Sequence, residues 1–418
     1  MKGTGSVELF NALSVAEACR VLERHIRLPR RKITVPLNTA LGCRLYEDVK
    51  APEDVPGFGR STMDGFAVGA RDTFGASESL PAYLDVAGEV FMGKGVDIAA
   101  GPGQAWRIPT GGMLPEGCDA VVMVEYTEEL DSRTIGVTRP VAPGENIVAP
   151  GEDLSGGEII YRGGRVIRPQ ELGTLAAAGI TLVDVEDPLR VSVISTGDEV
   201  VDPQITPGPG QVRDVNSYAL YGLADRAGGI PRLCGIVGDD YRLLRDVMEK
   251  ELAQADIILL SGGSSVGARD VSARVMEDLG QPGILFHGMA IKPGKPTIGA
   301  VVNGKPVIGL PGHPVSAMVV FLLMVEPLLS RGKYPADEEQ FLMGFPVTAA
   351  ITRNLRSAAG REDFIRVGLR QEGGNLMADP VLGKSGLIST MSRADGLARI
   401  PADLEGVEAG DRIRVRII

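Results

Sequence analysis

Three stretches decide the fold of this 418-residue chain: DIILLSGGSSVGARD (256–270), AIKPGKPTIGA (290–300) and VIGLPGHPVSAMVVFLL (307–323). In each, a short apolar run typical of a buried strand leads into a loop rich in glycine or proline that also carries charge or hydroxyl groups. Open parallel sheets bind their ligands outside the carboxyl ends of the strands. The stretches therefore predict an α/β sheet with a ligand site at that edge, and a phosphate-bearing ligand suits such loops.

The pattern of predicted strands and helices in the rest of the chain indicates a multidomain α/β plus β protein. Strands alternate with helices around the three stretches, which indicates a doubly wound, mostly parallel sheet covered on both faces. Residues 7–28 keep apolar positions at helical spacing and predict an amphipathic helix. We predict four domains: a small mixed α/β domain from 1–50 with 151–188, a β-rich insert at 51–150, the α/β domain at 189–334, and a C-terminal β-barrel at 335–418.

Composition excludes several classes of protein. A formal charge of -11 and a pI of about 5.0 argue against a nucleic-acid binder, which would show a basic face. The four cysteines form no CxxC pair and no zinc set. The first residues lack the apolar core of a signal peptide, and the apolar run at 317–325 ends at Glu326 and Pro327, short of a membrane span. We expect a cytoplasmic protein without nucleic-acid or membrane partners.

Acidic residues follow three of the predicted parallel strands. Asp198 and Glu199 come after RVSVIST, Asp239 and Asp240 after RLCGIVG, and Asp270 after the glycine-rich loop. Neighbouring strands end at the same edge of a sheet, so these carboxylates should converge. Clustered carboxylates beside a phosphate suit Mg²⁺. Each acid taken alone is better explained as a helix cap, and only the group of acids favours a metal site.

The loop SGGSSVGARD has the chemistry of an anion cradle. Gly262 and Gly263 allow a ligand to approach the backbone closely, and Ser264 and Ser265 add hydroxyl groups before the next helix. The spacing matches neither a Walker A motif nor a dinucleotide fingerprint. A tight turn with Asp270 as the helix N-cap explains the same residues equally well.

Cationic and hydroxyl residues follow in the next two stretches. The prolines of KPGKP stiffen the loop that carries Lys292 and Lys295, and two like charges held together favour an anion between them. Ser316 adds a hydroxyl just after the GLPGHP turn. His313 lies in that turn, and because no nucleophile or second ligand accompanies it in the sequence, we predict a structural role for it.

Eight motifs, in this order and over nearly the whole chain, resemble those of the MoeA family of molybdopterin molybdenumtransferases, to which the C-terminal domain of gephyrin also belongs. They are STMDGFAV, PTGGMLPEGCDAVV, GEDLSGG, STGDEV, LSGGSSVGARD, KPGKP, GLPGHPVSA and GKSGLIST. The resemblance implies a homodimer whose central domain is similar to molybdopterin adenylyltransferase. It also implies an enzyme that hydrolyses adenylylated molybdopterin with Mg²⁺ or another divalent cation, inserts molybdate and releases AMP.

The resemblance also assigns roles to individual residues. The catalytic positions it implies are Asp64, Thr110, Asp153, Glu199, Asp239 and Asp270, with Asp239 and Asp270 as metal ligands. The substrate-binding positions it implies are Gly262, Gly263, Ser264, Ser265, Lys292, Lys295, Pro311, Pro314, Ser316, Arg361 and Ser385. From their surroundings alone, Asp64, Thr110 and Asp153 would be ordinary turn residues. Gly288 departs from the pattern, since some relatives carry a lysine there.

Two other functions stay open at this point. An adenylyltransferase that makes the activated pterin would suit the central domain equally well, although the extra β domains with Arg361 and Ser385 favour the enzyme that consumes it. The second is a peptide-binding scaffold like gephyrin. A scaffold need not retain catalytic acids, whereas this chain has Asp64, Asp239 and Asp270. The adenylyltransferase that supplies the substrate and the maturation proteins of molybdoenzymes are the partners that the resemblance suggests. Molybdate and tungstate share shape and charge, so the sequence favours neither.

Overall fold

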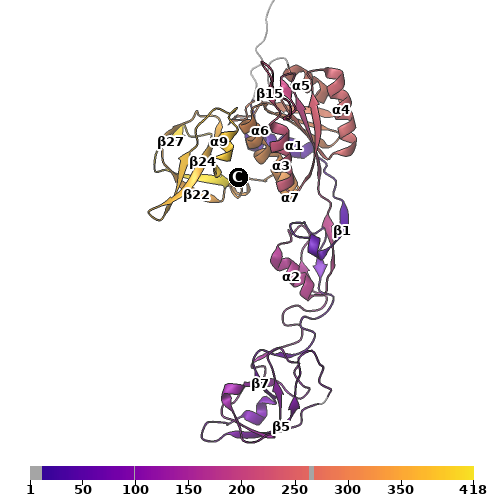
Figure 1. Cartoon of the computed structure of the whole chain (residues 1–418), viewed down its shortest axis with the longest axis vertical. Helices are drawn as coiled ribbons and strands as arrows, with labels where there is room; N and C mark the ends of the chain where they lie inside the picture. Colours follow the sequence, from indigo (N-terminus) through magenta and orange to yellow (C-terminus); the bar gives the residue numbers. More distant parts are fainter. Residues whose placement is uncertain (1–11, 98, 263–267) are drawn as a thin grey trace, which may run out of the picture. The chain divides into compact units, whose positions relative to one another are not determined.

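The structure, a computed structural model, describes residues 12–97, 99–262 and 268–418, with only the backbone of residues 268–270. The chain divides into two compact units (Figure 1). Unit 1 comprises Met1–Arg30 and Pro188–Ile418, and unit 2 comprises Arg31–Asp187.

Unit 1 contains a six-stranded sheet of strand order β16-β13-β17-β21-β20-β18. The first four strands in this order are parallel, β20 is antiparallel to β21, and β18 is antiparallel to β20. The strands are β13 (Arg190–Thr196), β16 (Ile230–Val237), β17 (Ile257–Ser261), β18 (Pro282–His287), β20 (Ile298–Val302) and β21 (Lys305–Leu310). The predicted mostly parallel α/β sheet is therefore confirmed.

Helices cover both faces of this sheet (Figure 1). Alternate residues of β17 explain why, since Ile257 and Leu259 belong to one apolar core and Ile258 and Leu260 to the other. The helices of the first core are α1 (Val15–His25), α3 (Asn216–Arg226) and α6 (Pro314–Val320), and those of the second are α4 (Tyr241–Gln254) and α5 (Ala268–Asp278).

The first helix differs from its predicted place. The described part of the 7–28 prediction is helical only over α1, because the Ser14 side chain caps the helix by accepting a hydrogen bond from the Glu17 backbone N-H. Its apolar stripe, including Val15 and Leu22, packs in the core of unit 1 and not with residues 151–188. The amphipathic pattern showed that this helix buries one face, but not against which sheet.

A long apolar helical stretch runs from Pro314 to Arg331 as α6, a π-helical segment (Phe321–Val325) and α7 (Glu326–Arg331). Its length and composition would suffice to cross a membrane. Most of it is buried in the core of unit 1, where Phe321, Leu322 and Met324 are almost inaccessible to solvent. A single helix of this kind is weak evidence for a membrane span, because the buried core helix of a soluble protein has the same length and composition.

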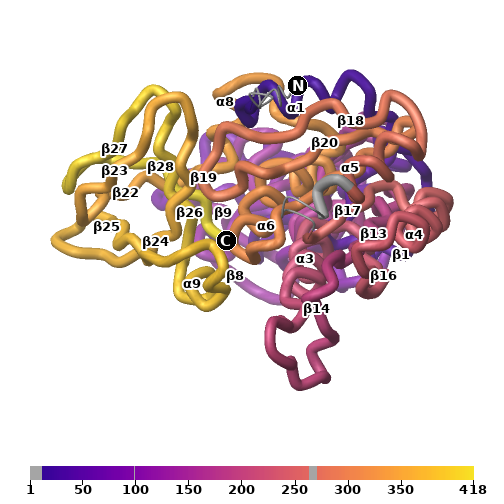
Figure 2. The backbone as a smooth tube through the Cα atoms, turned by 90° about the horizontal axis from the view of Figure 1, so that it is seen from above, coloured from indigo at the N-terminus to yellow at the C-terminus, as the bar shows by residue number. Residues whose placement is uncertain are grey.

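The C-terminal strands of unit 1 close into a barrel of order β24-β25-β22-β28-β26, because β26 also pairs with β24. The short strand β19 adds to the barrel by pairing with β24, and Figure 2 shows it next to the C-terminal strands. The strands are β19 (Ile291–Lys292), β22 (Val347–Ile351), β24 (Glu362–Glu372), β25 (Asn375–Pro380), β26 (Gly396–Ile400) and β28 (Arg412–Ile417). The expected C-terminal barrel is confirmed.

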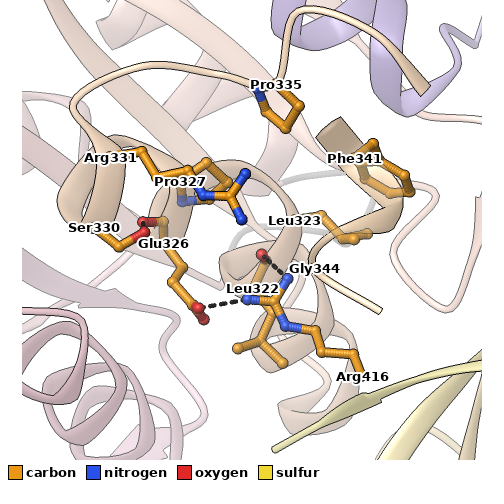
Figure 3. A pocket seen from close by; sticks show the side chains of 10 residues that line it. All are labelled: Leu322, Leu323, Glu326, Pro327, Ser330, Arg331, Pro335, Phe341, Gly344 and Arg416. Atoms are coloured by element: carbon orange, nitrogen blue, oxygen red, sulfur yellow. Dashed lines mark hydrogen bonds and ion pairs between the residues drawn. The ribbon is translucent and has the colours of Figure 1, made fainter. Parts of the chain in front are cut away.

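Arg416 of β28 attaches the barrel to the start of α7 and to the π-helical segment before it. Its guanidinium forms an ion pair with Glu326 and donates a hydrogen bond of 3.0 Å to the Leu322 carbonyl (Figure 3). The three groups line a small pocket of about 40 Å³. Together with the pairing of β19 and β24, this contact makes the barrel part of unit 1.

Unit 2 contains a six-stranded sheet of order β7-β4-β6-β5-β9-β8 within residues 51–150. Residues on either side of that sheet pair with each other: β1 (Lys32–Pro36) with β12 (Leu182–Glu186), and β2 (Val49–Lys50) with β11 (Ile159–Tyr161). The sheet consists of β4 (Gly65–Val68), β5 (Ala82–Glu89), β6 (Gln104–Ile108), β7 (Ala120–Met123), β8 (Thr127–Glu129) and β9 (Thr134–Val137). The four predicted domain boundaries themselves stay a prediction.

Candidate functional site

The carboxyl ends of β13 and β17 approach each other so closely that glycine is required between them. Gly262 follows β17 with a φ of 119°, and a Cβ there would lie 2.0 Å from the Thr196 carbonyl oxygen of β13. No other residue fits this position without moving a strand. Gly263, Ser264 and Ser265, the other members of the predicted anion cradle, lie outside the described residues.

Three acids gather where β13 and β16 end. The Asp239 backbone N-H donates a hydrogen bond of 3.0 Å to the Asp198 carboxylate, and Glu199 is the next residue of that turn. Partial burial, together with the negative charges of Asp198 and Glu199, raises the pKa of Asp239. Asp240 instead caps α4, since its carboxylate accepts a hydrogen bond of 2.9 Å from the Leu243 N-H. Asp239 thus belongs to the acidic cluster, whereas its neighbour Asp240 acts as a helix cap.

These acids have the donor chemistry for a hard divalent cation, because a cation would offset the burial of the Asp239 carboxylate and the negative charges of Asp198 and Glu199, which together raise the pKa of Asp239. Among the described residues, however, no three histidine, cysteine or acidic side chains are already arranged to hold a metal ion. The backbone of Asp270 lies in the first turn of α5, directly after β17, which neighbours β13 in the sheet. Its side chain lies outside the described part of the chain.

We expect the Asp239→Asn variant to be slightly more thermostable than wild type in metal-free buffer at pH 7, by about 1–2 °C. A raised folded-state pKa means that the native carboxylate destabilises the fold once pH rises through that pKa. The advantage of the variant should therefore vanish below about pH 4, where both forms are neutral at this position.

Differential scanning calorimetry in EDTA and in excess Mg²⁺ measures both effects. Mg²⁺ should raise the melting temperature of wild type and of the control Asp246→Asn, whose side chain is exposed on α4, but not that of Asp239→Asn. An equal increase of the melting temperature by Mg²⁺ in all three proteins would show that Asp239 does not bind the cation.

A pocket of about 600 Å³ lies between the α/β sheet and the barrel of unit 1. It brings together six of the predicted substrate-binding residues, which come from the KPGKP loop, the end of β21, the start of α6 and the barrel. They are Lys292, Lys295, Pro311, Ser316, Arg361 and Ser385. Pro314 is absent from the lining and occupies the first turn of α6.

The pocket is strongly cationic. Its lining carries the positive side chains Lys292, Lys295, Arg361, Arg366 and Lys384. No aspartate or glutamate of the described chain is among its lining residues. Like charges gathered in one cavity attract an anion, and arginine with serine can also supply directed hydrogen bonds to its oxygens.

The KPGKP loop is shaped by its glycine and held by backbone hydrogen bonds. Gly294 has a φ of 117°, and a Cβ there would lie 2.6 Å from a side-chain carbon of Ile291. The Thr297 hydroxyl donates a hydrogen bond of 2.6 Å to the Gly294 carbonyl, and the Met289 N-H donates one of 2.9 Å to the Lys295 carbonyl. The loop thus presents both lysines from a fixed backbone. Gly288, where some relatives carry lysine, has a φ of 116° that disfavours any side chain.

His313 belongs to the pocket, although we predicted a structural role for it. Its Nδ1 lies 3.1 Å from the Ser385 hydroxyl, and the Val315 N-H donates a second hydrogen bond, of 3.1 Å, to the Ser385 carbonyl. The two bonds attach the barrel loop that carries Ser385 to the start of α6. Sequence alone could not reveal this pair, since 72 positions separate its members.

The sequence prediction also missed Asp363, Arg366 and Lys384. Arg366 of β24 is largely buried and donates hydrogen bonds to the Val381 and Gly383 carbonyls, which places the loop that leads to Lys384. Asp363 lies between Arg361 and Lys292. The one available sequence indication was the string REDF at 361–364, which puts Arg361 and Asp363 two residues apart on an extended segment, hence on one face.

Glu199 and Asp239 do not share this pocket with the lysines, although the sequence predicted one ligand site at this edge of the sheet; the side chain of Asp270 lies outside the described residues. Neither Glu199 nor Asp239 is among the residues that line it. The order of the sheet accounts for the difference. The acids follow β13 and β16, whereas the pocket begins beyond β17, at the end of β21.

In unit 2, Asp64 and Thr110 form a direct pair. The Asp64 carboxylate accepts hydrogen bonds from the Thr110 backbone N-H at 2.7 Å and from its hydroxyl at 2.9 Å, which lower the pKa of Asp64. Both residues are exposed. Asp153 is exposed in a turn where its backbone N-H donates to the Val55 carbonyl. The structure thus brings the first two predicted residues together.

Three family descriptions match the chain in succession. Residues 13–179 match the MoeA N-terminal region (domain I and II), residues 192–331 match the probable molybdopterin binding domain, and residues 348–418 match the MoeA C-terminal region (domain IV). Together the matches span both units.

Individual relatives agree with these matches. The chain is 36% identical to a putative molybdopterin biosynthesis protein of Methanocaldococcus jannaschii over 89% of this chain and 88% of that protein. It is 34% identical to molybdopterin molybdenumtransferase 2 of Mycobacterium tuberculosis over 96% and 98%. A crystal structure of the molybdopterin biosynthesis MoeA protein of Pyrococcus horikoshii is similar with a TM-score of 0.83 and 31% identity, covering 98% of this chain and 100% of that chain.

Proposed function

The chain belongs to the MoeA family, and from that premise we propose that it acts in molybdenum cofactor biosynthesis as a molybdopterin molybdenumtransferase. In this reaction the enzyme inserts molybdate into adenylylated molybdopterin and releases AMP. The observation that carries the proposal is the cationic pocket of unit 1, because molybdate is a tetrahedral dianion and the substrate is a phosphate ester.

The pocket residues supply binding and orientation. Lys295 and Arg361 attract the oxyanion, and the Ser385 hydroxyl would donate a hydrogen bond to it with His313 as the tautomer whose Nδ1-H donates to Ser385. The buried Ser316 hydroxyl lies on the same lining. Fixed groups of this kind reduce the entropy that a productive geometry costs.

The acids at the ends of β13, β16 and β17 are assigned to the hydrolysis of the phosphoanhydride bond. Asp239 and Asp270 would hold Mg²⁺ or another divalent cation, with Glu199 beside them. When bound, such a cation offsets the negative charge of the phosphates. The glycine- and serine-rich loop that begins at Gly262, after the strand between β13 and β21, would bind a phosphate of the substrate.

We also propose that the protein is a cytoplasmic homodimer. In that assembly, the Asp64 and Thr110 pair and Asp153 of one subunit would complete the site of the other. The adenylyltransferase that makes the substrate and the maturation proteins of molybdoenzymes are the expected partners. The peptide-scaffold alternative gives no reason for five cations on one pocket, and the relatives above 30% identity favour the transferase over the adenylyltransferase.

An assay of both products tests the proposal. The purified chain is incubated with adenylylated molybdopterin, Mg²⁺ and molybdate, and the released AMP and pterin-bound molybdenum are quantified. We expect the two products in equal amounts. A protein that instead forms adenylylated molybdopterin from ATP and metal-free molybdopterin would be the adenylyltransferase, and a protein with neither activity would contradict both enzymatic assignments.

The His313→Ala variant should bind molybdate about threefold to tenfold more weakly than wild type, because Ser385 loses the hydrogen bond that orients its hydroxyl. The matched control is His25→Ala, at the last turn of α1 and outside the pocket. Isothermal titration calorimetry with molybdate compares the three proteins. Wild-type affinity in His313→Ala would return His313 to a structural role.

A further inference from the structure

Asp363 is a fully buried carboxylate directly behind the cationic pocket. Its side chain is 0% exposed, and its Oδ1 accepts a hydrogen bond of 2.9 Å from Nε of Arg361. Its Oδ2 lies 3.8 Å from Nζ of Lys292 and has no hydrogen-bond partner among the described residues. Asp363 therefore contacts two pocket cations in different ways: by a hydrogen bond to Arg361 and by an ion pair without a hydrogen bond to Lys292.

The backbone places Asp363 there. Strand β19 pairs in parallel with β24 so that Lys292 and Asp363 are register partners, and the Glu362 N-H donates a hydrogen bond of 2.9 Å to the Ala290 carbonyl. Side chains alternate along β24, so Glu362 faces the other way and pairs with Arg399, outside the pocket lining. The buried side chains of Glu362 and Asp363 thus lie on opposite faces of β24 and pair with different cations.

A buried carboxylate with an unpartnered oxygen costs free energy unless neighbouring charges compensate it. Here the compensation comes from groups that also line the pocket, Arg361 with 36% and Lys292 with 57% of the side chain exposed. A pair that served stability alone would not need its cations on a cavity wall. The hydrogen bond to Asp363 fixes the Nε edge of the Arg361 guanidinium. The other N-H groups of Arg361 remain available to a ligand in the pocket.

We propose that Asp363 is a positioning residue of the anion site: it fixes Arg361 in the orientation that binds the oxyanion and keeps Lys292 near without bonding it. Lys292, beyond hydrogen-bond distance of Asp363, is free to move onto an arriving anion. Arg361 acts as the rigid half of the site and Lys292 as the mobile half. Taking molybdate as the anion rests on the proposed function.

Two substitutions separate position from charge. Asp363→Asn keeps an oxygen that can accept from Arg361 Nε and removes only the charge, whereas Asp363→Leu removes the acceptor at similar size. We expect Asp363→Leu to raise the dissociation constant for molybdate about tenfold and Asp363→Asn to stay within about threefold of wild type. Glu362→Gln, which alters the adjacent acid and arginine pair outside the pocket, is the matched control.

A double-mutant cycle identifies the residue through which Asp363 acts. If Asp363 works through Arg361, Asp363→Leu should add less than about twofold to the loss already caused by Arg361→Ala. Melting temperatures show that each variant is folded, and the affinities are compared only between folded proteins. A folded Asp363→Leu with wild-type affinity, an Asp363→Asn as impaired as Asp363→Leu, or independent losses in the double variant would each overturn the proposal.

Titration of orthophosphate alongside molybdate keeps this inference separate from the proposed function. A wild-type protein that binds orthophosphate but not molybdate would count against the molybdenumtransferase, while the variant series measured with orthophosphate would still decide the role of Asp363. A wild type that binds neither oxyanion would contradict both.

Discussion

The Asp270→Asn variant should release AMP from adenylylated molybdopterin at least about a hundredfold more slowly than wild type while retaining its fold. Asp270 lies in the first turn of α5, the helix that follows β17, and β17 neighbours β13, the strand that leads to Glu199. Asparagine preserves the size of the side chain but removes the negative charge that a divalent cation requires. The rate is measured by chromatography of AMP, with circular dichroism as the check on folding.

Asp246→Asn, an exposed substitution on α4, is the control for this experiment and should release AMP at the wild-type rate. Because the deficit arises from cation binding, higher Mg²⁺ concentrations should recover part of the lost rate in Asp270→Asn. A folded variant with unchanged turnover would reject Asp270 as a metal ligand.

The Lys295→Ala variant should weaken molybdate binding by about tenfold or more and leave the affinity for AMP within about twofold. Lys295 lines the cationic pocket, held by a loop whose backbone is fixed by the Lys295 carbonyl and by Gly294. In the proposed arrangement the nucleotide phosphate lies nearer the acids and the glycine at the end of β17. Removing one ammonium group should therefore affect the oxyanion alone.

Calorimetric titration with each ligand separates the two affinities. Lys333→Ala, an exposed lysine outside the pocket lining, removes the same charge and controls for the lower net charge of the protein. Equal losses of molybdate and AMP affinity in Lys295→Ala would contradict this division of labour.

The α/β sheet of unit 1 was predictable because its central strands are apolar runs typical of buried strands. β17 reads IILLS and is buried on both faces, as a central parallel strand must be, and the helical periods between strands are equally distinct. The partner of α1 was not predictable. An amphipathic helix shows which of its faces is buried, but the identity of the opposing sheet depends on how the chain returns at Pro188.

The site was predictable where one loop carries the chemistry and not where two segments meet. Lys292 and Lys295 stand three residues apart, so KPGKP shows their proximity directly. Asp363 acquires its role only because β24 pairs with β19, a pairing that no local pattern encodes. The same holds for His313, which gains a partner from the barrel, and for the acids, whose separation from the pocket follows from the position of β17 in the sheet.

The location of the bound oxyanion decides whether the cationic pocket of unit 1 is the anion site. Crystals of the full chain soaked in tungstate, which has the shape and charge of molybdate, would reveal the metal by its anomalous scattering. We expect tungsten in the unit 1 pocket, in contact with Lys295 and Arg361 and beside Ser385. Tungsten bound only outside this pocket, with the pocket empty, would contradict it.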